Sequence, residues 1–380
     1  MAAPHAQAAP AGLDGVVVTD TRIGDVRGDE GFFHYRGYDA TDLARTRRLE
    51  DVWHLLVYGD LPDASEADHF TDRIADLRRG FSSALFDRVH EVTAGATDRV
   101  AALRTAWSLA ATDLGVRPWL DLTGQQRLEQ ALALAAVGPL LVAATHRPGV
   151  ADDLDGLPTS TAAAYLQLVT GEAPKPDRVA ALERYLVLTI DHGLNASTFT
   201  ARVVTSTGAD LGAVLVAAVG ALSGPLHGGA PSRALEMLDD IATPDRAEAW
   251  IRDSVGRGER IMGFGHRIYR TEDPRARLLR ETARDLGGSR IDLALQVEAT
   301  ARRVLRELKP DRVLDVNVEY HAAVVMEAVG LPPALFTPTF AVSRAIGWTA
   351  HALEQMDGNR IMRPSSRYTG PDPVRAVPGR

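Results

Sequence analysis

The stretch Leu211-Gly-Ala-Val-Leu-Val-Ala-Ala-Val-Gly-Ala-Leu222 is apolar at every position, and Ser223-Gly-Pro-Leu-His227-Gly-Gly229 follows it directly. In a soluble protein, a helix that is apolar on all sides is enclosed by other helices. Ser223-Gly224-Pro225 ends this helix, and Ala230-Pro231-Ser232 opens the next one. The stretch therefore predicts a helical protein built around this segment, with His227 in a short glycine-rich loop between two helices.

Helical periodicity extends over most of the remaining chain, where Ser, Thr or Asp precedes apolar residues at three- and four-residue spacings. The expected helices include 51–58, 176–190, 231–241, 245–257, 274–286, 291–308, 319–329 and 339–354. Residues 14–38 favour strands instead, because the β-prone runs Val16–Thr19 and Phe32–Tyr35 are separated by glycines. The predicted fold class is all-α with a small N-terminal β-hairpin at 14–38.

The composition of the 380 residues is that of a globular protein, with 45% hydrophobic and 24% charged residues. Cysteine is absent, which excludes thiol nucleophiles, Cys–zinc sites and disulfides. A formal net charge of −8 argues against nucleic acid as a partner. Residues 1–12 lack the features of a signal peptide, and the apolar run 131–144 is too short to span a membrane. We therefore expect buried core at 131–144 and a cytoplasmic protein.

Two histidines stand where a structural role is strained. His192 follows the apolar run that ends at Ile190 and precedes Asn195 and Ser197, which are typical helix-capping residues. The ring of His192 must either have a hydrogen-bond partner in the protein or serve the function, because buried polar groups are rarely left unpaired. His227 lies between glycines that allow a ligand close approach, and the positive end of the following helix favours its neutral form. Glycines on both sides favour a functional role for His227.

The segment Met262-Gly-Phe-Gly265-His266-Arg-Ile-Tyr-Arg270 precedes a helix capped by Asp273-Pro274. Gly-Phe-Gly is too short for a dinucleotide-binding fingerprint and lacks the strand that such a fingerprint follows. As a loop, the segment offers backbone amides, His266 and the arginines at 267, 270 and 275. This density of donors suits an anionic ligand.

Two charged side chains complete the candidate set. Glu319 stands at a helix start in Asn317-Val-Glu-Tyr-His321, where a carboxylate also complements the helix dipole and alone proves nothing. Arg344 lies inside the otherwise apolar helix at 339–350 and needs an anion, either from the protein or from a substrate.

In this order, these segments resemble the citrate synthase family. The likeness runs from Gly12-Leu-Asp-Gly-Val-Val17 through Tyr35-Arg-Gly-Tyr-Asp39 to Arg363-Pro364, nearly the whole chain. Each motif alone is modest, but five in the same order are specific. The resemblance implies a citrate-synthase-like two-domain helical fold. In it, 1–227 and 336–380 form a large domain, and 228–335 form a small mobile domain on the CoA side.

The resemblance also implies the roles of the site residues. His227, His266 and Glu319 align with the catalytic His, His and Asp of the family. Oxaloacetate would be bound by His192, Arg275, Arg344 and Arg363, with Arg363 contributed by the other subunit of a homodimer. CoA would be contacted by Ile261, Met262, Gly263, Phe264, Gly265, Arg270 and Arg367. The implied reaction condenses acetyl-CoA with oxaloacetate and hydrolyses citryl-CoA, with no cofactor or metal beyond the co-substrate.

One position departs from the family pattern. Most relatives read Asn-Val-Asp-Phe-Tyr-Ser-Gly where this chain reads Asn317-Val-Glu-Tyr-His-Ala-Ala323. The additional methylene moves the carboxylate by roughly 1 Å, and such a misplacement costs on the order of 100-fold in rate if the backbone is fixed. A slightly withdrawn helix would restore the position. The chain resembles an actinobacterial branch in which Glu is usual here, so Glu319 is the expected base.

Two alternatives remain open from the sequence. A 2-methylcitrate synthase has the same fold and mechanism with propionyl-CoA as donor, and one methyl group changes binding by only about 1–3 kcal/mol. A non-catalytic paralogue that binds CoA or citrate for regulation is suggested by the Asp-to-Glu change. The presence of both histidines and the substrate arginines argues against it.

Overall fold

The computed structural model describes residues 8–225, 227–228, 231–266, 269 and 271–371. Within this part of the chain, seventeen α-helices account for most of the fold, as the sequence predicts. Their bounds are α1 Ala40–Thr46, α2 Leu49–Tyr58, α3 Ala64–Arg79, α4 Ser83–Thr93, α5 Arg99–Asp113, α6 Gly124–Ala136, α7 Gly138–His146, α8 Thr161–Thr170, α9 Pro176–Thr189, α10 Ala196–Ser206, α11 Leu211–Leu222, α12 Pro231–Ile241, α13 Ala247–Gly256, α14 Pro274–Leu286, α15 Ser289–Leu308, α16 Val318–Ala328 and α17 Phe336–Met356.

The only sheet in the described residues has three antiparallel strands, β1 Gly24–Arg27, β2 Phe32–Tyr35 and β3 Tyr38–Asp39, in the order β1-β2-β3. The expected strand at Val16–Thr19 is wrong: this segment belongs to no strand, and Val17 is 83% exposed. Phe32–Tyr35 pairs with Gly24–Arg27 across a short turn. A neighbouring partner closes a shorter loop than Val16–Thr19 would, so its pairing loses less chain entropy.

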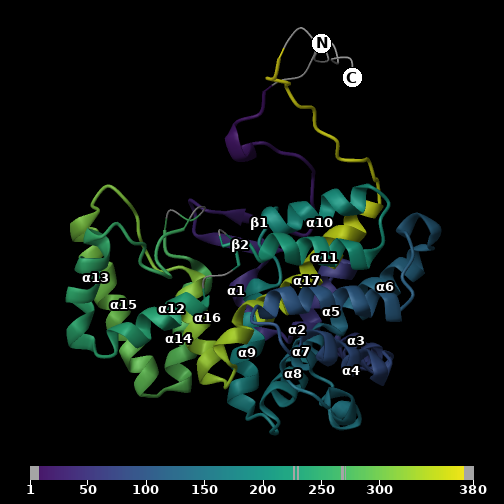
Figure 1. The fold of residues 1–380 in the computed structure, drawn as a ribbon, viewed down its shortest axis with the longest axis horizontal. Coiled ribbons are helices and arrows are strands. Elements are labelled where there is room, and N and C mark those ends of the chain that lie inside the picture. The colour runs from purple at the N-terminus through teal and green to yellow at the C-terminus, as the bar shows by residue number, and fades with distance from the viewer. Residues whose placement is uncertain (1–7, 226, 229–230, 267–268, 270, 372–380) are drawn as a thin grey trace, which may run out of the picture.

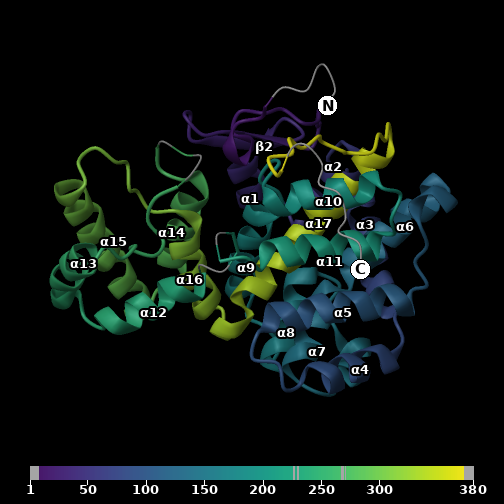
Figure 2. The same ribbon diagram turned by 45° about the horizontal axis from the view of Figure 1, so that its top comes forward.

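Helix α17 lies at the centre of the larger helical body, and Figures 1 and 2 show it enclosed by other helices. It packs against α6, α7, α9, α10 and α11. Almost all of its residues are buried, including the arginine at 344. Residues 131–144 are buried as well, which confirms their prediction as core. The span Gly124–His146 is apolar and long enough to cross a membrane, but 83% of its most apolar window is buried inside the fold.

Helix α11 differs from its prediction on one face. Leu211, Val214 and Leu215 are fully buried, whereas Val216, Ala217 and Gly220 are only half-buried in the single chain. The helix is therefore enclosed on one side and covered incompletely on the other. Such a partly exposed apolar face on small residues can receive another helix at close distance.

Helices α12 to α16 gather on one side of the molecule, apart from α2 to α8 in both views (Figures 1 and 2). Contacts of α14 and α16 with α9 connect the two groups. Ion pairs cross the same boundary, because Arg45 of α1 pairs with Glu281 and Arg184 of α9 with Asp285, both on α14. The candidate site residues lie along this boundary.

Candidate active site

His192 lies directly after α9, where Asp191 and Asn195 interrupt the helical path. Its side chain is buried, with Nε2 3.0 Å from the hydroxyl oxygen of Tyr269. The ring centroid lies 6.1 Å from that of His266. Burial first, and then the charge of Arg275, lowers the pKa of His192 well below its ordinary value. The ring is therefore neutral at physiological pH.

A buried chain of polar groups fixes this loop. Asp191 accepts a hydrogen bond from the backbone N–H of Gly193 and lies 3.1 Å from Nε2 of His351. Arg202 donates from Nε to Nδ1 of His351 over 3.0 Å. Because arginine only donates, Nδ1 is the acceptor, and His351 donates from Nε2 to Asp191. The hydrogen bonds of Asp191, His351 and Arg202 thus hold the conformation of the His192 loop.

His227 lies in the loop after α11, and its Nε2 is 2.9 Å from Oγ of Ser197 in the first turn of α10. The same hydroxyl oxygen accepts the indole N–H of Trp348 over 3.2 Å. Burial first, and then the positive charge of Arg344, lowers the pKa of His227 to about 4. The sequence predicts a neutral His227, and the low pKa agrees with this prediction, with burial as its largest cause.

His266 follows a loop that is joined to the start of α16. Phe264 forms an antiparallel bridge with Val316, and Asn317 donates from its side chain to the carbonyl oxygen of Gly265. Nδ1 of His266 accepts the backbone N–H of Tyr269 over 2.9 Å. Burial and then Arg275 lower the pKa of His266 to about 4, so the ring is neutral. Its Nε2 lies 3.2 Å from Nη2 of Arg275, a group that can only donate.

Glycine at position 263 permits this loop conformation. The residue has φ of +79°, which favours glycine, and a Cβ there would lie 2.7 Å from Cβ of Tyr320. Tyr320 follows Glu319 in α16, so the loop 261–265 and the helix that carries Glu319 are packed directly on each other. The sequence identifies the loop but not this contact.

Two of the predicted oxaloacetate-binding arginines, Arg275 and Arg344, are buried in different environments. Arg275 is buried in the first turn of α14 and forms a two-pronged ion pair with Asp273. Arg344 is 1% exposed and donates from Nε to the carbonyl oxygen of Thr189, with its guanidinium 4.7 Å from the centre of the Phe340 ring. Within the described residues Arg344 forms no ion pair, although a buried guanidinium calls for an anion.

Glu319 stands in the first turn of α16, where the side chain of Asn317 caps the helix and accepts the N–H of Glu319. Its side chain is half-buried. Burial raises the pKa of Glu319 to about 7, against a lowering effect of Arg275 and with a further raising effect of Asp273. The carboxyl is thus poised to exchange a proton near neutral pH, which suits a general base.

The remaining predicted residues are distributed unevenly. Ile261 is buried, and Met262 and Phe264 are half-buried next to α16. Arg363 and Arg367 are exposed on the segment after α17. Arg270 lies outside the described residues.

The sequence did not single out Tyr269, Asp273, Ser197 or Trp348 as site residues. Asp273 caps α14, as the sequence indicates. Ser197 is not the cap of α10, because Asn195 caps that helix and accepts both the backbone N–H and the hydroxyl of Ser197. Trp348 belongs to an apolar helical pattern. Their proximity to the histidines depends on contacts between residues far apart in the chain, which helical periodicity does not encode.

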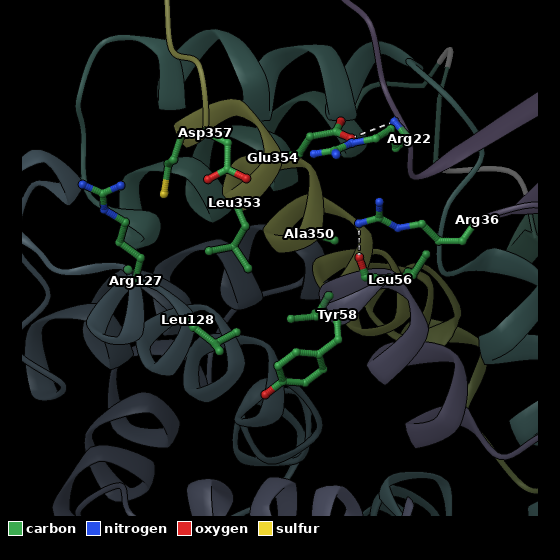
Figure 3. Close-up of a pocket in the computed structure, with 13 residues that line it drawn as sticks. Arg22, Arg36, Leu56, Tyr58, Arg127, Leu128, Ala350, Leu353, Glu354 and Asp357 are labelled. Atoms are coloured by element: carbon green, nitrogen blue, oxygen red, sulfur yellow. Dashed lines mark hydrogen bonds between the residues drawn. The ribbon is translucent and has the colours of Figure 1, made fainter. Parts of the chain in front are cut away.

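A separate hollow lies between α2, α6 and the end of α17 (Figure 3). Arg22, Arg36 and Arg127 line it together with Glu354, and none of the predicted site residues does. Arg36 donates to the carbonyl oxygen of Leu56, and Glu354 accepts the backbone N–H of Arg22. Glu354 also pairs with the buried Arg202. These contacts anchor the N-terminal segment to α17.

The chain is similar to known proteins along almost its whole length. A sequence model described as "Citrate synthase, C-terminal domain" matches residues 12–365. "Putative citrate synthase 2" of Mycobacterium tuberculosis is 40% identical over 375 residues, covering 95% of this chain and 93% of that protein. "2-methylcitrate synthase" of Shewanella oneidensis is 34% identical over 372 residues, covering 97% and 96%.

Solved structures give the same result. A citrate synthase of Thermoplasma acidophilum, in a ternary complex with carboxymethyl coenzyme A and oxaloacetate, superposes with a TM-score of 0.85. It is 27% identical, and the match covers 97% of each chain. The citrate synthase of Thermotoga maritima is 29% identical, with a TM-score of 0.82 over 97% of this chain and 98% of that one.

Proposed function

Because the chain belongs to the citrate synthase family and is a condensing enzyme of that type, we propose that it joins acetyl-CoA to oxaloacetate and hydrolyses citryl-CoA to citrate and CoA. The observation that carries this proposal is a pair of histidines with pKa values of about 4 and a carboxyl with a pKa of about 7, arranged around two buried arginines. Neutral donors and a poised base are what enolisation of a thioester requires.

In the proposed reaction, Glu319 removes a proton from the methyl group of acetyl-CoA. His227 donates a hydrogen bond to the thioester oxygen, on which the enolate charge develops. Oγ of Ser197 lies within reach of both Nε2 of His227 and Oδ1 of Asn195, so its proton can serve either atom. When Ser197 donates to Nε2, the proton of His227 is on Nδ1 and can reach the substrate.

His266 acts on the second substrate in this proposal. With oxaloacetate bound, the proposal assigns the ring proton of His266 to Nε2, where it polarises the ketone and is transferred to that oxygen as the new carbon–carbon bond forms. Nδ1 accepts the backbone N–H of Tyr269, which orients the ring. Water then attacks the thioester of citryl-CoA and releases citrate and the CoA thiol.

The substrate carboxylates would be bound by Arg275 and Arg344, with His192 as a further donor. Arg344 is buried without a direct ion pair among the described residues, although the charge of Asp191 acts on it, so an incoming carboxylate gives it a direct partner. The loop Ile261–Gly265 would contact the CoA adenine, with Arg270 and Arg367 near its phosphates. We further propose that 228–335 close over the rest of the chain as a unit, excluding water until condensation is complete.

We propose a homodimer that shares its sites, located in the cytoplasm. Two features of the single chain support a second copy: the half-buried face of α11 at Val216, Ala217 and Gly220, and the exposed position of Arg363. A C2 dimer presents the same segment from both subunits, so each Arg363 can complete the oxaloacetate site of its partner.

Mixing two inactive variants tests this sharing. Arg363→Leu and Glu319→Gln homodimers are each expected to be inactive, and subunit exchange should restore about a quarter of the wild-type activity. The reason is that half of the dimers are then mixed, and each mixed dimer has one site with both groups intact. Coumarin- and tag-labelled subunits verify the exchange. Verified exchange without recovered activity would show that Arg363 acts within its own chain.

The second candidate is 2-methylcitrate synthesis, favoured by the similarity to the enzyme of Shewanella oneidensis. Release of the CoA thiol from acetyl-CoA and from propionyl-CoA, each with oxaloacetate, distinguishes the two. We expect the larger kcat/KM with acetyl-CoA, by about 10-fold or more, because one methylene changes pocket affinity by this order. A preference for propionyl-CoA favours the second candidate, and no thiol from either donor favours a non-catalytic protein.

A further inference from the structure

Asp273 makes more contacts than a helix cap requires. It is fully buried just before α14. Each of its two carboxylate oxygens accepts two hydrogen bonds. Oδ1 accepts the backbone N–H and the Nε–H of Arg275, each over 3.0 Å. Oδ2 accepts from Nη2 of Arg275 over 2.8 Å and from the backbone N–H of Val318 over 3.1 Å. The carboxylate therefore has no acceptor position left for a substrate.

These bonds connect three parts of the candidate site. Arg275 is the proposed oxaloacetate-binding residue on α14, and Val318 begins α16 immediately before the proposed base. Nε2 of His266 lies 4.0 Å from Oδ2 of Asp273. Resting on the proposed function, we propose that Asp273 is a positioning residue that fixes the Arg275 guanidinium and the carboxyl of Glu319 relative to each other.

The geometry favours this role over simple capping. The capping bond to the N–H of Arg275 uses only Oδ1, and an asparagine or serine would make it equally well. Oδ2 instead accepts from the backbone N–H of Val318 on α16 and from Nη2 of the Arg275 guanidinium. Occupying Nε and Nη2 of Arg275 leaves Nη1 for a substrate carboxylate, since Nη1 makes no hydrogen bond among the described residues. Asp273 thereby sets the angle at which Arg275 meets oxaloacetate.

The charge of Asp273 also acts on the base. Burial raises the pKa of Asp273, but Arg275 outweighs it, so the carboxyl is ionised. The charges that face Glu319 are Arg275, which lowers its pKa, Asp273, which raises it, and Arg260, which lowers it. His266 is neutral and the amide of Asn317 is uncharged. Removing the charge of Asp273 therefore lowers the pKa of Glu319, and the guanidinium that is no longer neutralised lowers it further.

The first test is Asp273→Asn, which keeps the shape and one acceptor oxygen but removes the charge and the second acceptor. We expect KM for oxaloacetate to rise about 10-fold or more, since arginine is held through paired bonds. We also expect the acid limb of kcat/KM against pH to move about one unit lower. Asp98→Asn makes the same change at the N-cap of α5, remote from the site, and should leave both values unchanged.

The second test is Val318→Pro, which deletes the N–H that Oδ2 accepts and exchanges the partly buried valine side chain for a proline ring. Proline is suited to the first position of a helix, and Asn317 before it has φ −105° and ψ 175°, which proline permits. This variant should lower kcat about 10-fold, because the base moves, while KM for oxaloacetate stays within about twofold of the wild type. Thermal unfolding checks that each variant is folded, and if Asp273→Asn is not, Val318→Pro decides.

The outcomes separate this proposal from the proposed function. If Asp273→Asn lowers kcat with KM and the acid limb unchanged, or if Val318→Pro leaves kcat unchanged, Asp273 is only a cap and the proposal is overturned. If the wild type releases no thiol, the proposed function fails. The affinity for oxaloacetate, measured by calorimetric titration, then tests the positioning role of Asp273. Weaker binding to Asp273→Asn than to the wild type supports the positioning role, whereas equal binding, or no binding to the wild type, overturns it.

Discussion

Glu319→Gln is expected to lower kcat for condensation about 100- to 10,000-fold, which is the range for losing a positioned general base. Glutamine has nearly the same shape, so the bond that the backbone N–H of residue 319 donates to Asn317 and the packing of Tyr320 against Gly263 remain. Oxaloacetate should bind as in the wild type, because Arg275, Arg344 and His192 are untouched. Thiol release measures the loss, and calorimetry with oxaloacetate measures the binding that is retained.

The pH dependence of kcat/KM in the wild type tests the role of Glu319 independently. Because burial raises the pKa of Glu319 to about 7, kcat/KM should fall as the pH drops below this value. His227 and His266, with pKa values of about 4, stay neutral throughout this range and add no limb of their own. An acid limb near pH 4.5, the ordinary value for glutamate, would place the base elsewhere.

Stability should change in the opposite direction to activity. The folded-state pKa of Glu319 lies above its unfolded value, so the stabilising contribution of the protonated carboxyl is present below about pH 4.5 and is lost as the pH rises through about 7. Glutamine resembles the protonated form at every pH. The melting temperature of Glu319→Gln should therefore exceed that of the wild type at pH 8 and approach it near pH 4.5.

A matched control stands on the same helix. Glu327 is in the last turn of α16, where it pairs with Arg290 on the surface. Glu327→Gln removes an equivalent charge from α16 without touching the site, so turnover should remain within about twofold, as for most surface ion pairs. A Glu319→Gln enzyme that turns over as well as Glu327→Gln would contradict the assignment of the base.

Most helices could be predicted from the sequence because their information is local. The apolar spacing and the capping residues of α9, α12 and α14 recover their bounds to within a residue or two. The sheet could not be predicted so well, because Val16–Thr19 and Gly24–Arg27 both precede Phe32–Tyr35 and only pairing decides between them. β-propensity is a property of surroundings more than of the residues themselves.

The site residues likewise include some that local sequence predicts and others that it does not. His227 and His266 are visible in the sequence because glycines flank them, and glycines at +79° and +88° in the loop 261–265 bear out its special backbone. Glu319 lacks such a local signal: its raised pKa comes mainly from burial, with a further raising effect of Asp273 that Arg275 opposes. Asp273 reads as a cap because only the tertiary fold brings Val318 to its second oxygen. Long-range polar contacts are what a single sequence does not reveal.

His227→Ala is expected to lower kcat about 100- to 1,000-fold, the range for removing one donor to a developing oxyanion. The donor is needed only when the thioester becomes an enolate, so the loss should fall on kcat, with KM for oxaloacetate changed little. Its pKa of about 4 makes His227 neutral, and a neutral imidazole stabilises the enolate by donating a hydrogen bond, without giving up its proton. The acid limb of the variant should therefore coincide with that of the wild type.

His146→Ala is the control for deletion of a half-buried imidazole. His146 is in the last turn of α7, and burial lowers its pKa as well, so the two positions share their protonation state but differ in location. Turnover within about twofold of the wild type is expected for the control, as for substitutions away from the site. If both variants lose activity equally, the loss reflects destabilisation. If His227→Ala alone shifts the acid limb, then His227 is the titrating group and the roles of His227 and Glu319 must be exchanged.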